Sequence, residues 1–384
     1  MSKINKVVFL SYSKLTKKIL SEYSINNFLE KNIIFEYIDL TELLRKDHID
    51  NGMINDYKYY VKIDSYIDLI KYLKKNRDSD CVYFVNIPIQ FKFLLFYSII
   101  TFYKIDTWII MNFGNPSFLV KRGFFQKLVN HIIHPSLFFN ILINNIFYKL
   151  VTKFNIIKKH SITFCVGLAE LNNNHHTVKK ISINSSDYEK ACLLEDVNRI
   201  NTNENGKIIF LDIFLPFHND LDLSKDKRVN PEIYYNELNN FFIKLEEFYE
   251  NEIIIAAHPT AIYKNNPFQG RKIIYNNTNE LVKYSSFVIS HWSTSVNYAI
   301  IYKKPILFFY TSEMLIHYRF SHILSLISYS NSLSQKLVYV NDNNIFDSNF
   351  IINEKLYSNY IEKYISFNTG NKKNIDIFLT NLFL

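Results

Sequence analysis

The stretch FVISHWSTSVNYAIIYKKPILFFY, residues 287–310, sets the fold class of this chain. It opens with an apolar strand pattern at Phe287–Ser290 and closes with another at Ile306–Tyr310, directly after Pro305. The segment between them, which Ser293 opens, has the length and composition of a short helix. A strand, a helix and a strand in this order form a βαβ unit, so the sequence predicts a parallel α/β sheet.

The alternation of strands and helices continues outward from this unit. Upstream, strand patterns at Ile208–Leu211 and Ile253–Ala256 flank a long helix pattern at Pro231–Tyr249, and a shorter helix is predicted at Asn279–Tyr284. The first half of the chain repeats the alternation, which predicts a second α/β sheet. There we predict strands at Val7–Tyr12, Ile33–Ile38, Cys81–Ile87 and Thr107–Asn112, and helices at Ser65–Lys75 and Phe124–Ile133.

Two polar stretches near the middle of the chain, Leu171–Ser186 and Asn201–Gly206, predict loops. We place the domain boundary between them, which gives a first domain at 1–195, a second domain at 196–350 and a helical segment at 351–384. Two Rossmann-like α/β domains that face each other across a cleft make the GT-B architecture. The C-terminal helix can cross back to the first domain in such a fold.

The composition excludes several classes of enzyme. The chain has 384 residues, 48% of them hydrophobic and 21% charged, as in a globular protein. It has 7 glycines, none close enough to another to write a glycine-rich dinucleotide loop, a P-loop or a nucleophile elbow. The three cysteines, Cys81, Cys165 and Cys192, form no CxxC pair, which fits a reducing cytoplasm. No apolar stretch predicts a signal peptide or a transmembrane helix.

The formal net charge of +8 is unevenly spread. Between Asp80 and Glu170 the only acidic residue is Asp106, whereas lysines and arginines stand there among many Phe, Ile and Leu. Such a surface suits the headgroups of an anionic membrane, so we expect a cytoplasmic protein peripheral to the inner membrane. The alternative is a buried helical core with ordinary solvated lysines. We expect no nucleic-acid partner, because no recognition motif accompanies the charge.

We expect no metal site. His175 and His176 fall in a predicted polar loop without nearby carboxylates or thiols, so we predict solvated side chains. Asp220-Leu221-Asp222 resembles the DxD motif of metal-dependent glycosyltransferases. It lies well past the preceding strand rather than at its end.

Polar residues follow three predicted strands of the second half, and such strand ends are where parallel sheets bind ligands. Asp212 ends the first of these strands, where a carboxylate can take a proton from an acceptor hydroxyl. Its alternative role is to cap the turn that contains Pro216. His258 ends the second strand and is fixed there by Pro259, so its imidazole can donate to a phosphate oxygen. A structural histidine is the alternative.

The third strand end carries Ser293, Thr294 and Ser295 at the start of a predicted helix. Consecutive hydroxyls there offer donors where the helix dipole favours an anion. Simple N-capping is the alternative. The pattern predicts a phosphate site that needs neither glycine nor metal.

Three segments carry a family resemblance: FLDIFLPFHND at 210–220, AAHPTAIYKNNPFQGR at 256–271 and SHWSTSVNYAIIYKKPI at 290–306. They resemble surface-carbohydrate proteins of bacterial O-antigen and capsule loci. The order of acidic residue, His-Pro and Ser/Thr cluster also resembles the CMP-sugar-dependent GT-B glycosyltransferases, which include bacterial sialyltransferases and Kdo transferases. The similarity covers about Gly206 to Tyr310. The family's acidic motif ends in Gly, whereas Asp212 is followed by Ile213.

The resemblance implies roles for individual residues. His258 and the cluster Ser293–Ser295 would contact the CMP phosphate, beside Pro259. Glu280 is the positional candidate for the ribose hydroxyls. Arg271 would pair with the carboxylate of an acidic donor sugar, since guanidinium binds carboxylates bidentately, unless it is a surface arginine.

The function that the resemblance implies is a metal-independent glycosyltransferase without cofactor. It would move sialic, legionaminic or pseudaminic acid, or Kdo, from a CMP-sugar to a bacterial surface glycan of the lipopolysaccharide, O-antigen or capsule type. The acceptor would be a lipid-linked or lipid A-core oligosaccharide. One alternative is another donor at the same phosphate site, such as CDP-glycerol or a UDP- or GDP-sugar. The other is a non-catalytic glycan- or nucleotide-binding member of a synthesis complex.

Overall fold

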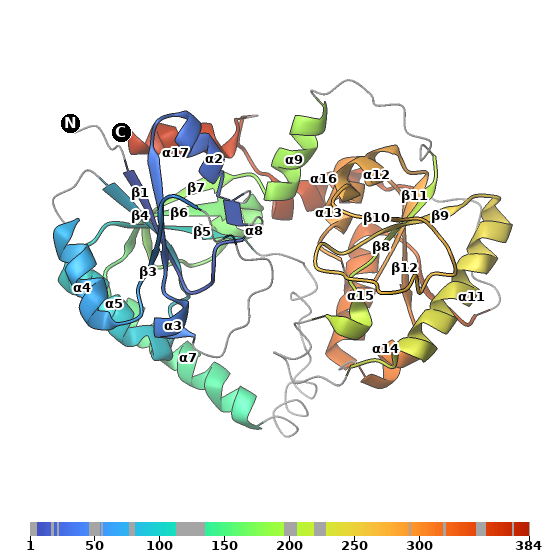
Figure 1. The fold of residues 1–384 in the computed structure, drawn as a ribbon, viewed down its shortest axis with the longest axis horizontal. Helices are drawn as coiled ribbons and strands as arrows, with labels where there is room; N and C mark the ends of the chain where they lie inside the picture. The colour runs from blue at the N-terminus through green and yellow to red at the C-terminus, as the bar shows by residue number, and fades with distance from the viewer. Residues whose placement is uncertain are drawn as a thin grey trace. The chain divides into compact units, whose positions relative to one another are not determined.

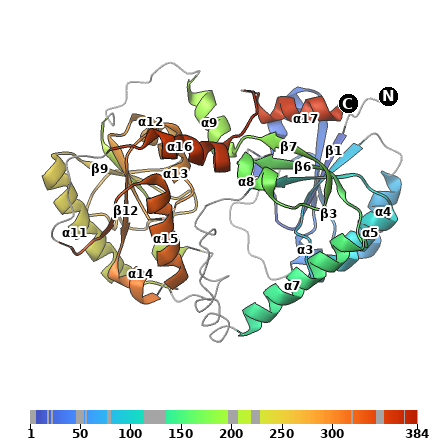
Figure 2. The ribbon, with the colours of Figure 1, turned by 180° about the vertical axis from the view of Figure 1, so that it is seen from behind.

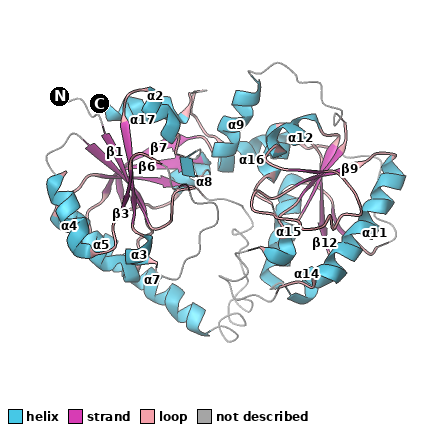
Figure 3. Ribbon diagram, in the orientation of Figure 1, coloured by secondary structure: helices cyan, strands magenta, loops and turns pink. Residues whose placement is uncertain are grey.

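The computed structural model describes residues 6–16, 19–20, 23–45, 54, 57–76, 81–112, 135–195, 206–218, 228–291, 293–317, 320–342, 351–370 and 372–383. These residues form two compact units. The first unit takes its described residues from 6–112, 135–186 and 368–383, and the second from 187–367. Each unit is a parallel sheet with helices on both faces (Figure 1 and Figure 3).

The first unit contains a sheet of the order β3-β2-β1-β4-β5-β6-β7, in which every neighbouring pair is parallel. Its strands are apolar and buried at the centre, which is the pattern of a sheet covered on both faces. The strands are β1 (Lys6–Ser11), β2 (Ile34–Asp39), β3 (Tyr60–Lys62), β4 (Cys81–Asn86), β5 (Thr107–Met111), β6 (His160–Val166) and β7 (Thr177–Ile183).

Two apolar clusters cover the two faces of this sheet. Helices α4, α5 and α7 belong to one face and α2 and α17 to the other. Ser65 fixes the start of α4, because its hydroxyl accepts the Asp68 N–H at 3.1 Å. The helices are α2 (Ile25–Glu30), α3 (Thr41–Leu44), α4 (Tyr66–Lys75), η1 (Phe91–Phe93), α5 (Leu94–Phe102), α7 (Pro135–Lys153), α8 (Gly167–Asn172) and α17 (Asn374–Leu382).

The C-terminal helix α17 returns to the first unit, as predicted. The ring of Phe378 lies 4.8 Å from that of Phe164 and 6.1 Å from that of Phe28, so α17 completes an aromatic cluster on one face of the sheet. Asn374 fastens its start, because its side chain accepts the Asn184 N–H at 2.8 Å and donates to the Asn184 carbonyl at 2.9 Å.

The second unit has a parallel sheet of the order β10-β9-β8-β11-β12-β13. Asn230 and Pro231 set the start of its longest helix, since the Asn230 side chain accepts the Glu232 N–H at 2.9 Å. Its strands are β8 (Ile208–Leu211), β9 (Ile253–Ala256), β10 (Ile273–Ile274), β11 (Phe287–Ser290), β12 (Ile306–Tyr310) and β13 (Leu337–Tyr339). Its helices are α9 (Ser186–Glu195), η3 (Leu215–Phe217), α11 (Pro231–Tyr249), α12 (Thr278–Tyr284), α13 (Val296–Ile301), α14 (Ser312–His317), α15 (Phe320–Leu333), α16 (Glu354–Tyr360) and η4 (Ile361–Ile365).

The predicted loop at Leu171–Ser186 is wrong. It contains β7, which pairs in parallel with β6 at the edge of the first sheet. His175 and His176 are not solvated either. His175 Nε2 lies 2.9 Å from Glu170 Oε2, and the ring of buried His176 bonds the Ile157 carbonyl at 2.9 Å. The prediction failed because this edge strand, with two lysines and an exposed Val178, lacks the apolar run of a central strand.

The two units divide at Ser186 and Asp187, so most of α9 groups with the second unit. Two bonds to α12 explain this grouping: Asn279 Nδ2 donates to the Lys190 carbonyl at 2.9 Å, and Lys283 Nζ to the Leu194 carbonyl at 3.1 Å. The helix predicted at Phe124–Ile133 and the motif at Asp220 and Asp222 lie outside the described residues. Within the part of the chain that the structure describes, no helix is long and apolar enough to span a membrane.

Candidate active site

The carboxyl ends of β9, β8 and β11 lie side by side, because these strands are neighbours in the sheet of the second unit. This edge carries the three predicted clusters. Each lies in a loop that follows a buried strand, which is the usual place of ligand sites in open α/β sheets. The sequence correctly placed the strands that bring these loops together.

Asp212 is held tightly in the loop after β8. One carboxylate oxygen accepts the Phe214 N–H at 2.9 Å, and the other accepts a hydrogen bond from the Tyr263 hydroxyl. The side chain is only 4% exposed. Burial raises the pKa of its carboxyl group above the usual range, although the hydrogen bonds act to lower it. The geometry thus matches the turn-capping role of Asp212, because an acceptor hydroxyl has no open face of the carboxylate to approach.

The turn that Asp212 caps presents His218. Phe214 adopts a left-handed conformation with φ of 54°, the helical turn η3 follows, and His218 comes at its end. Arg228 holds the far side of this turn, since its exposed guanidinium donates to the Pro216 carbonyl at 3.1 Å. Neither His218 nor Arg228 was predicted from the sequence as a site residue. The one signal for His218 was its place in the loop directly after β8.

His258 lies after β9, as predicted, half-buried at the turn that Pro259 begins. Its Nδ1 lies 2.8 Å from Thr260 Oγ1 and 3.3 Å from the Thr260 backbone nitrogen, whose N–H can only donate. Nδ1 is therefore the acceptor, and the neutral ring carries its proton on Nε2. An imidazole in this tautomer can donate from Nε2 to an anion.

The rings of His218 and His258 lie 5.2 Å apart at an angle of 62°. They come from the loops after two adjacent strands, so the fold brings together two imidazoles that are far apart in sequence. Imidazoles are able to donate hydrogen bonds in both protonation states. This pair is the main chemical feature of the strand-end edge.

The cluster Ser293–Ser295 follows β11 and precedes α13. Ser293 is buried, and its hydroxyl accepts the Ser295 N–H at 3.2 Å, which is local capping. Thr294 is exposed and Ser295 half-buried. The next N–H groups, from Val296 to Tyr298, already bond carbonyls of the cluster at 3.1–3.2 Å. The structure therefore offers the exposed Thr294 hydroxyl rather than a row of backbone donors.

Glu280 lies half-buried in the first turn of α12. That helix follows β10, so the residue is near the same carboxyl edge of the sheet. The role of Glu280 as a ribose ligand stays a prediction.

Arg271 is not placed to bind a donor sugar. Its guanidinium pairs bidentately with Glu246 at 3.0 and 2.6 Å and donates to Asn239 Oδ1 at 3.2 Å. The ring of Phe242 lies 5.4 Å from its central carbon. Glu246 also accepts the N–H of Ile253 at 3.0 Å, so this cluster lies at the amino end of β9, away from His258. Arg271 is thus paired with a carboxylate of the chain itself, that of Glu246, and not with one of a donor sugar.

Across the described residues, no three or more His, Cys, Asp or Glu side chains are grouped so that they could hold a metal ion.

Comparison with known proteins places the fold. No family model and no curated protein matches the sequence. Among solved structures, the wall teichoic acid polymerase TagF is similar over 99% of this chain and 89% of its own, with 13% identity and a TM-score of 0.53. The glycosyltransferase SnogD from Streptomyces nogalater is similar over 100% and 99%, at 6% identity and a TM-score of 0.48. The UDP-GlcNAc 2-epimerase from Methanocaldococcus jannaschii, solved with UDP-GlcNAc and UDP, is similar over 98% and 99%, at 14% identity and a TM-score of 0.44.

The chain has a GT-B-like fold. The predicted fold class is confirmed: two parallel Rossmann-like sheets, one in each unit, with the C-terminal helix back on the first. Identities this low show the fold alone. In this GT-B-like chain, the histidine pair lies at the carboxyl edge of the second sheet.

Proposed function

We propose that this chain is a glycosyltransferase that binds the phosphate of a nucleotide-sugar donor at His258 and His218. The observation that carries the proposal is the 5.2 Å approach of the two rings at adjoining strand ends. Arg228, fastened to the same turn as His218, adds a permanent positive charge. Donors fixed in advance around a leaving phosphate stabilise the charge that develops on it.

In the proposed reaction, an acceptor hydroxyl oxygen forms a bond to the anomeric carbon of the donor sugar. The bond from that carbon to the phosphate oxygen breaks, the nucleotide leaves with the electron pair, and the proton of the acceptor hydroxyl passes to solvent water. His258 donates from Nε2 to the departing phosphate, and the Thr294 hydroxyl supports it. Glu280 is the proposed ligand of the ribose hydroxyls.

Asp212 has a positioning role in this proposal and not the base role that we expected. Both of its oxygens accept hydrogen bonds, and its side chain is almost fully buried. By holding Phe214 in its left-handed conformation, Asp212 sets the turn from which His218 projects. Tyr263 shares this task through its hydroxyl.

The proposed donor is a CMP-linked acidic sugar, a sialic, legionaminic or pseudaminic acid or Kdo, and the proposed acceptor is a lipid-carried bacterial surface glycan. Support for the donor comes from the order of acidic residue, His-Pro and Ser/Thr cluster, which resembles that of CMP-sugar-dependent transferases. Support for the acceptor comes from the resemblance of the segments at 210–220, 256–271 and 290–306 to surface-carbohydrate proteins. CDP-glycerol and UDP- or GDP-sugars are the competing donors for the same phosphate site.

Calorimetric titration of the full chain with CMP, UDP, GDP and CDP, without added metal, tests this proposal. We expect selective CMP binding that weakens about 10- to 100-fold in His258→Ala, the loss of one hydrogen bond to a charged group. Lys336→Ala is the matched control, because this exposed residue lies before β13, at the opposite edge of the sheet. Preference for another nucleotide would reject the CMP donor, and equal binding by His258→Ala would reject the site.

A further inference from the structure

Helix α7 exposes an apolar face that the first unit leaves uncovered. Phe147 and Val151 on one side of the helix are buried in the core of the unit. On an adjoining side, Ile143, Ile146 and Leu150 are each about half exposed, at 48%, 50% and 47%. Their spacing of three and four residues puts them on a single stripe along the helix. A stripe of this size on a water-exposed helix indicates a partner.

The face continues beyond α7. Phe154, just after the helix, is exposed, and so are Leu95 and Phe102 on the neighbouring helix α5. The two helices lie side by side against the same face of the first sheet (Figure 2). Two contacts fasten α7 to η1, the turn that leads directly into α5: the Phe91 ring packs edge-on against that of Phe147 at 5.6 Å, and the Phe91 N–H donates to Asn144 Oδ1 at 3.0 Å. We call Leu95, Phe102, Ile143, Ile146, Leu150 and Phe154 the α5–α7 surface.

The charge around this surface is positive. Lys149 and Lys153 are exposed on α7, beside the apolar stripe, and Lys104 is exposed just after α5. From Cys81 to Ala169 the sequence holds one acidic residue, Asp106.

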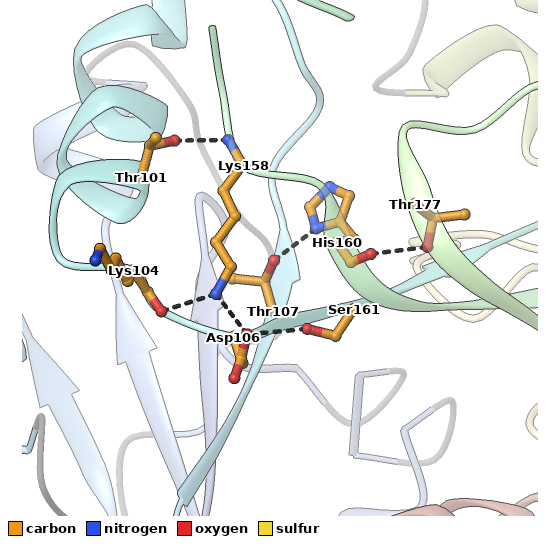
Figure 4. Close-up of polar contacts among 8 residues, drawn as sticks. All are labelled: Thr101, Lys104, Asp106, Thr107, Lys158, His160, Ser161 and Thr177. Atoms are coloured by element: carbon orange, nitrogen blue, oxygen red, sulfur yellow. Dashed lines mark hydrogen bonds and ion pairs between the residues drawn. The ribbon is translucent and has the colours of Figure 1, made fainter. Parts of the chain in front are cut away.

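That one carboxylate is neutralised within the chain. Lys158 Nζ lies 2.5 Å from Asp106 Oδ1, and the Ser161 hydroxyl donates to the same oxygen at 3.2 Å (Figure 4). Lys158 is itself held in place, because its backbone N–H donates to Thr101 Oγ1 at 2.8 Å and its Nζ to the Lys104 carbonyl at 2.8 Å. The described surroundings of the α5–α7 surface therefore carry excess positive charge.

We propose that the α5–α7 surface binds the face of an anionic phospholipid bilayer. The apolar side chains enter the boundary between headgroups and acyl chains, while the lysines extend to the lipid phosphates. A second copy of the chain fits less well, since a symmetric contact would bring the same lysines together. The inference goes beyond the proposed function: the surface lies in the first unit, and the candidate phosphate site in the second.

Sedimentation with vesicles tests the inference on the full chain. Vesicles of phosphatidylcholine and phosphatidylglycerol at about 3:1 are compared with vesicles of phosphatidylcholine alone. We expect binding to the anionic vesicles, with a partition coefficient that falls about 25-fold in Lys149→Gln/Lys153→Gln, roughly fivefold per lysine. In Ile146→Ser/Leu150→Ser we expect a fall of about tenfold or more on the same vesicles.

Matched controls change equally exposed residues elsewhere. Val178→Ser/Ile351→Ser removes apolar side chains that are 76% and 77% exposed, and Lys336→Gln/Lys363→Gln removes exposed lysines of the second unit. Both controls should bind as the wild type does, and circular dichroism should show all four variants folded.

Three results would overturn the inference: equal binding of the wild type to both kinds of vesicle, unchanged binding of Ile146→Ser/Leu150→Ser, or a wild-type dimer that this variant converts to a monomer. The third result would assign the surface to contacts between copies of the chain. CMP calorimetry on the same preparations separates the two proposals. If the wild type binds vesicles but not CMP, the donor site is rejected and the membrane role of the α5–α7 surface remains supported.

Discussion

Asp212→Asn separates a positioning residue from a catalytic base. The substitution keeps the size of the side chain. It also keeps an oxygen that can accept the Phe214 N–H, whose nitrogen lies 2.9 Å from Asp212 Oδ1 in the wild type. The new amide can donate to the Tyr263 hydroxyl, which at present donates to Asp212. Both hydrogen bonds therefore survive, and we expect CMP affinity and turnover within about threefold of the wild type. A general base replaced by an amide would instead lose about 10²- to 10⁴-fold in turnover.

Asp212→Ala provides the contrast. It leaves the Phe214 N–H and the Tyr263 hydroxyl without their acceptor inside the unit, and each unpaired buried group costs about 1–3 kcal/mol. We expect the second unit to lose about 2–6 kcal/mol of unfolding free energy. CMP binding should weaken with it, because the turn that presents His218 loses its cap.

The assay pairs calorimetric CMP titration with release of CMP from a panel of CMP-sugars, and thermal denaturation reports the stability. A hundredfold loss of CMP release in Asp212→Asn, at unchanged CMP affinity, would refute the positioning role and make Asp212 the base. Lys336→Ala is carried through as the control, since it changes an exposed residue away from the candidate site.

Three further predictions concern stability and its pH dependence. Arg271→Ala should lower the unfolding free energy by about 3 kcal/mol in denaturant titrations, because Glu246 loses its bidentate partner, and a selective loss of donor-sugar affinity would contradict this. Phe378→Ala should destabilise the first unit by about 3–5 kcal/mol while CMP calorimetry stays unchanged, since the ring is buried against Phe164. Burial lowers the pKa of His291 to about 3 and that of His160 to about 4, whereas an unfolded histidine has a pKa of about 6.5. The unfolded chain therefore binds protons first as the pH falls below about 6.5, and the folded state loses stability. Calorimetric melting at pH 7 and pH 5 should show a loss of about 2 kcal/mol per histidine, and equal melting at both would contradict it.

The sequence predicted best where a strand is short, apolar and buried on both faces. Ile208–Leu211, Phe287–Ser290 and Ile306–Tyr310 are strands with the predicted bounds, because each is a short apolar run that ends directly before a polar residue. It failed at β7, where Val178 and Lys179 are exposed at the sheet edge. Local pattern carries no sign of the β6 backbone that pairs with this strand.

The sequence predicted at which strand ends the candidate site lies, but not all of the residues that form it. Strand ends located His258, but His218 depends on the left-handed Phe214 and the cap from Asp212, which a linear pattern does not contain. Arg271 is the reverse case, a predicted site residue that the structure pairs with another part of the chain. Its carboxylate partner, Glu246, stands 25 residues earlier on α11, and only the packing of α11 against the sheet brings the two together.

The shortage of glycine has a consequence for how this fold can hold a phosphate. Glycine-rich loops bind phosphate through backbone N–H groups, and the first N–H groups of α13 are already bonded to the Ser293–Ser295 carbonyls. Charge on a bound phosphate must therefore be met mainly by side chains at this edge. His218 and His258 are such side chains, with Arg228 on the same turn as His218. Affinity for the nucleotide should then depend on these side chains, and calorimetry should show CMP binding weakened in His218→Gln as well as in His258→Ala. Unchanged affinity in both variants would instead assign the phosphate to other donors and contradict this reasoning.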